Sequence, residues 1–161
     1  MKFMKKLIVL LGILFLGYGV YAQDYGTAIG LRGGETQGIT LKQFVGGSSA
    51  FDFILGTHHY GLNFTALYEI HSLDVFGVDN LALFYGFGGH VGLYSAGNYP
   101  SYWSDYSGSA TLIGIDGVVG VEYTFDEIPI SLSLDIVPSI NILPYLGYWQ
   151  RGALSIRYVL K

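Results

Sequence analysis

The chain has 161 residues, of which 51% are hydrophobic and only 12% charged, with 24 glycines and a formal net charge of −4. This composition excludes an intrinsically disordered chain, which needs low hydrophobicity and high charge. The length suits one domain. The sequence contains no cysteine, which excludes disulfides, thiol catalysis and cysteine-ligated zinc. Soluble domains usually have about a quarter charged residues, so we expect much of this surface to face something other than water.

The first 22 residues have the pattern of a secretory signal peptide. Three lysines within the first six residues precede the apolar run Leu7 to Val20, and a small-residue site ends at Ala22. We expect cleavage after Ala22 and one mature domain over residues 23–161. An uncleaved anchor helix is the disfavoured alternative, because a span needs about 20 apolar residues and this run contains three glycines. Cleavage would leave five basic residues against twelve acidic ones, which disfavours nucleic acid as a partner.

The remaining chain alternates with a period of two between polar and apolar residues, with turn residues in between, and this pattern predicts β-strands. Eight strands are expected, at 24–33, 37–45, 50–57, 61–71, 81–94, 110–125, 128–141 and 152–161. The connections 46–49 and 126–127 are tight, whereas 95–109 and 142–151 are long and rich in aromatic residues. Short turns at one end and longer loops at the other are typical of outer-membrane barrels.

The two faces of the predicted strands differ in bulk, and this difference indicates which face points inward. In the strand 81–94, one face has Leu83, Tyr85 and Phe87, whereas the other is largely glycine. Eight strands enclose a space only just wide enough for side chains, so the bulky apolar face cannot all point inward. Outward apolar residues require hydrocarbon around the barrel, and a closed barrel satisfies its backbone hydrogen bonds there. We therefore predict an all-β fold, an eight-stranded antiparallel up-and-down transmembrane β-barrel.

The predicted inward face contains both acids and bases. Because buried charges must be paired or hydrogen-bonded, we expect an ionic network that fills the lumen. Its expected members are Arg32, Lys42, Asp52, Glu69, His71, His90, Asp116, Glu122, Asp135 and Arg157, with Lys161 as a further candidate.

Aromatic residues gather near both ends of the predicted strands, as in the interfacial girdles of membrane barrels. A signal peptide would place the N-terminus in the periplasm, so the tight turns are expected on that side. The periplasmic girdle would contain Tyr25, Phe51, Tyr68, Tyr85, Tyr123, Phe125 and Tyr158. The outer girdle would contain Tyr94, Tyr99, Tyr102, Trp103, Tyr106, Tyr145, Tyr148 and Trp149.

Four stretches resemble small outer-membrane β-barrel proteins of Bacteroidetes-type bacteria. They are LFYGFGGHVGLY (83–94), GIDGVVGVEYTF (114–125), EIPISLSLDIVPS (127–139) and LSIRYVLK (154–161). The resemblance implies a relative of the eight-stranded outer-membrane barrels, a group with no established catalytic activity, that the barrel-assembly machinery inserts into outer-membrane lipid. Such chains commonly end on an aromatic residue, whereas this one ends on Lys161.

No cofactor-binding or metal-ligating pattern is present, and we expect a structural or surface-interaction role through the aromatic loops 95–109 and 142–151, without turnover and with an unidentified surface ligand. One alternative is a narrow channel. Another is an enzyme that modifies outer-leaflet lipid, for which His58 and His59 would lie in an outer connection near the serines of the loop 95–109. A third is a secreted soluble barrel that binds an apolar ligand.

Overall fold

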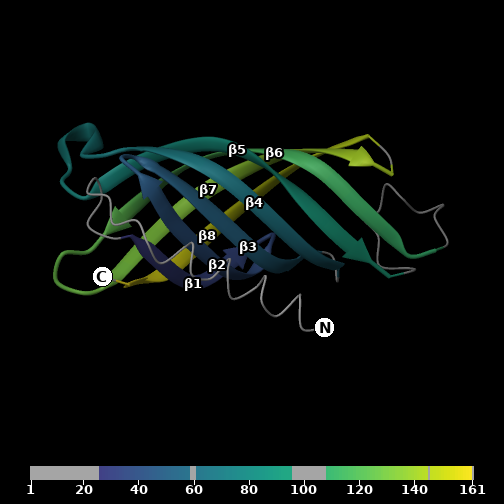
Figure 1. Ribbon diagram of the computed structural model, residues 1–161, viewed down its shortest axis with the longest axis horizontal. Helices are drawn as coiled ribbons and strands as arrows, with labels where there is room; N and C mark the ends of the chain where they lie inside the picture. The colour runs from purple at the N-terminus through teal and green to yellow at the C-terminus, as the bar shows by residue number, and fades with distance from the viewer. Residues whose placement is uncertain (1–25, 59–60, 96–107, 145, 161) are drawn as a thin grey trace, which may run out of the picture.

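The protein forms a closed barrel of eight antiparallel strands that follow one another in chain order (Figure 1). The computed structural model describes residues 26–58, 61–95, 108–144 and 146–160. The strands are β1 Thr27–Gly34, β2 Gln37–Gly46, β3 Ser49–His58, β4 Gly61–Ser72, β5 Leu81–Tyr94, β6 Ala110–Thr124, β7 Ile130–Leu143 and β8 Gly147–Leu160. The prediction of an all-β, eight-stranded, up-and-down barrel is confirmed. Within the described ranges, no helix has the length and apolarity needed to span a membrane.

The barrel closes between its first and last strands. β1 pairs with β8 from Thr27 opposite Leu160 to Gly34 opposite Ala153. Each strand therefore has two hydrogen-bonded neighbours. Closure removes the exposed edges at which a sheet would otherwise pair with other chains.

The largest difference from the predicted strands is at the start of β8. The segment expected to be a loop up to residue 151 is largely strand, because β8 begins at Gly147 and pairs Tyr148 with Ile140 and Trp149 with Ser139. Tyrosine and tryptophan suit strands as well as loops, so the aromatic composition of this segment did not distinguish the two. Arg151 consequently lies in a strand.

The connections do not separate by length as cleanly as predicted. At the end of the barrel that carries the C-terminus, residues 47–48 form a tight turn, but residues 73–80 form a longer connection with the short 3-10 helix η1, Val75–Gly77 (Figure 1). We call this end the terminal end. At the opposite end, which we call the loop end, β1 and β2 are joined by only Glu35 and Thr36. β5 ends and β6 begins at the loop end, and residues 95–109 separate these two strands in the chain.

Burial alternates along the strands, and the apolar side chains lie on the outside. Every strand contributes large exposed apolar residues, among them Leu31, Ile39, Leu55, Phe64, Phe87, Ile115, Leu134 and Leu154. Phe87 is 68% exposed and Leu31 is 63% exposed. The alternate positions are buried and include most of the charged residues of the strands. The barrel is therefore apolar outside and polar inside.

Glycines on the inward face make room for rings. A Cβ atom at Gly120 would lie 2.5 Å from the ring of Phe84, and one at Gly114 would lie 2.4 Å from the ring of His90. A Cβ atom at Gly92 would lie 2.7 Å from the ring of Tyr94. Side chains at these positions would displace the rings, so the glycines allow a narrow lumen to be filled by aromatic groups.

Candidate functional site

The polar lumen is the candidate site, and all eight strands contribute to it. The ten charged or histidine residues expected in the lumen are each at most 5% exposed. Lys161 lies outside the described residues. The structure places nine of these side chains, together with Arg151, in two charged clusters that are separated along the barrel axis, and His71 lies beside one of them.

The inner charged cluster lies nearer the terminal end and consists of Lys42, Asp52, Glu69, Glu122 and Arg157. Lys42 Nζ lies 2.6 Å from Glu122 Oε2 and 2.8 Å from Glu69 Oε2. β2 and β6, which hold Lys42 and Glu122, are four strands apart, the largest separation that an eight-stranded ring allows. Arg157 Nη2 of β8 lies 2.7 Å from Asp52 Oδ2 of β3. These ion pairs therefore run across the lumen.

Neighbouring polar groups complete the hydrogen bonding of the inner charged cluster. Arg157 donates through Nη1 to Ser133 Oγ at 2.7 Å and through Nε to Thr40 Oγ1 at 3.2 Å, and Thr40 donates to Asp52. His71 Nε2 lies 3.1 Å from Glu69 Oε2. Lys42 Nζ also lies 4.4 Å from the centroid of the Phe84 ring, a cation–π distance. Buried charges are tolerated when they are paired in this way.

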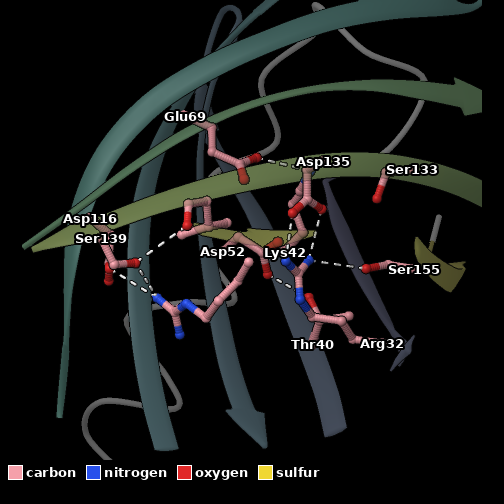
Figure 2. A network of polar contacts seen from close by, with 12 residues as sticks. Arg32, Thr40, Lys42, Asp52, Glu69, Asp116, Ser133, Asp135, Ser139 and Ser155 are labelled. Atoms are coloured by element: carbon pink, nitrogen blue, oxygen red, sulfur yellow. Dashed lines mark hydrogen bonds and ion pairs between the residues drawn. The ribbon is translucent and has the colours of Figure 1, made fainter. Parts of the chain in front are cut away.

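The outer charged cluster lies nearer the loop end and consists of Arg32, Asp135, Arg151, Asp116 and His90. Arg32 binds both carboxylate oxygens of Asp135, with Nη1 2.7 Å from Oδ2 (Figure 2). Arg151 Nη2 and His90 Nδ1 lie 2.9 and 2.8 Å from Asp116 Oδ1. The paired geometry of Arg32 and Asp135 is the stronger, bidentate form of an ion pair.

Three apolar clusters alternate with the charged ones along the axis. The first, at the terminal end, contains Ala28, Phe44, Ala50 and Val159. The second, between the charged clusters, contains Ile54, Leu67, Phe84, Val118 and Val137. The third, at the loop end, contains Tyr94, Ala110, Leu112 and Trp149. Along β6 the order Glu122, Val118, Asp116, Leu112 shows this layering directly. Over its described residues, the lumen is packed with side chains.

Several inward residues differ from the prediction. Trp149 was expected in the outer girdle, but it is 8% exposed and lies in the lumen. Tyr94 was also named for that girdle, although the alternation of its strand predicts an inward direction, and it is 2% exposed and lies in the lumen. Tyr94 is four residues from His90 in β5, and Trp149 is two residues from Arg151 in β8. Residues an even number of positions apart in a strand point to the same side, so the alternation predicts that both rings point inward. Arg151 is 3% exposed and was missed because its segment was predicted to be a loop.

The other predicted girdle residues are on the outside where the structure describes them. Tyr85, Tyr158 and Tyr148 are 50%, 55% and 64% exposed. Phe51, Tyr68, Tyr123 and Phe125 are partly exposed. Rings meet in pairs, with centroids 5.3 Å apart for Phe51 and Tyr68 and 4.9 Å apart for Tyr123 and Phe125. Tyr25, Tyr99, Tyr102, Trp103, Tyr106 and Tyr145 lie outside the described residues.

The histidine expected in an outer connection is instead inside the barrel. His58 is the last residue of β3, is 8% exposed and has Nδ1 2.8 Å from the carbonyl oxygen of Glu35. Its ring centroid lies 4.9 Å from that of Trp149. His59, Ser101, Ser104, Asp105 and Ser107, the other residues named for that enzyme, lie outside the described residues. Within the described ranges, no three histidine or acidic residues form a metal-binding group.

The fold and lumen define a class: a closed eight-stranded antiparallel barrel with an apolar exterior and an ion-paired interior. The chain matches no protein-family model and no curated protein.

Proposed function

We propose that this protein is an outer-membrane β-barrel of a Gram-negative bacterium, exported by a signal peptide, with a filled lumen and a structural or surface-interaction role. The observation that carries the proposal is the inside-out distribution of side chains. Apolar residues are exposed on every strand, whereas the charged residues of the lumen are at most 5% exposed. Such an exterior suits hydrocarbon, and outer-membrane lipid is thus the proposed surrounding partner. Insertion would require the barrel-assembly machinery.

The same distribution argues against a secreted soluble barrel for apolar ligands. A soluble binder of this kind would line its interior with apolar side chains and expose polar ones. Here the interior contains Lys42, Arg157, Arg32 and their acidic partners. An apolar ligand would have to displace these ion pairs.

The proposed interaction surface is the aromatic loop at 95–109. Four aromatic residues, Tyr99, Tyr102, Trp103 and Tyr106, support a contact role, because tyrosine and tryptophan are enriched where proteins bind partners. The loop 142–151, which was also expected from the sequence to bind partners, contributes less to this surface, since residues 147–151 belong to β8. No turnover is proposed.

Membrane residence and barrel closure can be tested together. After expression in a Gram-negative host, the protein should sediment with outer membranes and resist extraction by alkaline carbonate. Unboiled samples should migrate differently from boiled samples on a denaturing gel, because a closed barrel stays folded in detergent. Recovery in the aqueous periplasmic fraction would overturn the membrane proposal.

The filled lumen leads to a prediction about conductance. The purified protein in planar bilayers should show no steady ionic current, because the Lys42–Glu122 pair crosses the lumen and three apolar clusters lie along it. Protein-free bilayers with the same detergent serve as the blank. Stable, ion-selective current steps from the unmodified protein would instead favour the narrow channel.

Orientation gives a second prediction. An epitope tag inserted between Asn98 and Pro100 should be accessible to antibody on intact cells, whereas a tag at Gly47 should become accessible only after permeabilisation. The two insertion sites test opposite ends of the barrel. Residue 47 lies in the turn between β2 and β3 at the terminal end, whereas residues 98–100 lie in the chain between β5 and β6, which are connected at the loop end. Labelling at Gly47 alone would show the opposite orientation.

A further inference from the structure

A small cavity lies beside the outer charged cluster, towards the loop end of the second apolar cluster. Its volume is about 10 Å³, and it is lined by Arg32, Thr36, Ile54, Thr65, Val137 and Arg151. A cavity of about this volume holds one water molecule or one ion of similar size. None of the lining residues is acidic.

Three hydrogen-bond donors of the lining residues have no partner among the described residues. They are Nε of Arg32, Nε of Arg151 and Oγ1 of Thr36. These side chains are buried, with 5%, 3% and 3% of their surface exposed. Buried polar groups are nearly always hydrogen-bonded in native proteins, and an unsatisfied one is costly. Three such donors around one cavity indicate an occupant that accepts hydrogen bonds.

The chemistry of the donors favours an anion over water. The Nε–H groups of arginine can only donate, and the hydroxyl of Thr36 is free to donate as well. A halide accepts all three hydrogen bonds. A water molecule accepts at most two of these hydrogen bonds.

We propose that this cavity binds one small monovalent anion of chloride size between Arg32, Arg151 and Thr36. Arg32 is on β1, Thr36 is in the turn between β1 and β2, and Arg151 is on β8. The anion would therefore connect the first and last strands near the seam at which the barrel closes. The site lies inside the barrel and does not depend on what surrounds the exterior.

The probe is sodium bromide, compared with sodium gluconate at equal ionic strength, on the purified protein folded in detergent micelles. Gluconate is too large for a cavity of about 10 Å³. We expect the thermal unfolding midpoint to rise with bromide concentration and to saturate, because a ligand that binds only the folded state stabilises it. Crystals grown with bromide should give an anomalous peak within hydrogen-bond distance of Arg32 Nε and Arg151 Nε.

Two variants test the assignment of the donors. Thr36→Val removes one donor with little change in shape, and Arg151→Lys keeps a positive charge near Asp116 but removes Nε. Each should raise the half-saturating bromide concentration about tenfold. Ser131→Ala is the matched control, since Ser131 Oγ is also buried without a partner but does not line the cavity; its bromide response should equal that of the wild type.

Equal unfolding midpoints in bromide and gluconate would overturn the proposal in favour of water. An unchanged bromide response in both Thr36→Val and Arg151→Lys would place the anion elsewhere and would also overturn it. If one variant fails to fold, the other variant and the anomalous peak still decide the outcome.

Discussion

Replacing Lys42 by methionine is expected to destabilise the folded barrel by about 3–5 kcal/mol, the usual cost of removing one partner from a buried ion pair. Methionine has a similar length and no charge, so the cavity it leaves is small. Glu69 and Glu122 would remain buried at 1% exposure without the ammonium group that lies within 2.8 Å of both. The large effect follows because one cation holds two acids from β4 and β6 together.

Urea titration of the protein in detergent micelles, followed by the shift between folded and unfolded bands on an unboiled gel, would measure this loss. The double variant Lys42→Met with Glu122→Gln should be more stable than Lys42→Met alone, since it removes one of the two buried carboxylates that Lys42 neutralises. Asp126→Asn is the exposed control and should change stability by about 0–1 kcal/mol, because Asp126 lies in a solvated turn. Wild-type stability in Lys42→Met would show that the inner charged cluster does not hold the lumen together.

The strands and the direction of their side chains could be predicted because both depend only on a period of two. Once β3 is recognised, for example, Asp52 and Ile54 must point to the same side of the sheet. This side is the lumen, because the interior of an eight-stranded barrel is too narrow for the bulkier apolar side chains of the opposite face. The same rule predicts that Tyr94 points inward. It would have placed Trp149 inside as well if the segment 147–151 had been recognised as strand.

The pairing of charges could not be predicted from the sequence. Lys42 and Glu122 are separated by 80 positions and meet because β2 and β6 face one another across the closed ring. Whether Lys42 meets Glu122 or Asp116 depends on the shear of the barrel, which the hydrogen-bond register of all eight strands sets jointly. The start of β8 illustrates the same limit, because its pairing with β7 decides that Arg151 joins the outer charged cluster.

Replacing Ile136 by arginine is expected to destabilise the barrel in a lipid bilayer by about 2–4 kcal/mol, the cost of a basic residue on the lipid face near the bilayer midplane. Ile136 lies in the centre of β7 and is 43% exposed. Its neighbours across the sheet are Val119 on β6 and Gly152 on β8. An arginine there would have no carboxylate beside it and would have to reach the headgroup region for solvation.

The result separates a membrane barrel from a soluble one, because the same substitution on a water-exposed surface changes stability by only about 0.5 kcal/mol in either direction. Unfolding in phospholipid vesicles, followed by tryptophan fluorescence and by band shift, measures the difference from the wild type. Ile136→Leu is the matched apolar control and should fold as the wild type does. Ser131→Ala on the inward face of the same strand should also have a small effect, since the buried hydroxyl of Ser131 has no partner among the described residues. If Ile136→Arg folds into vesicles as stably as Ile136→Leu, the outer face of β7 does not contact hydrocarbon, and the proposal of a transmembrane barrel fails.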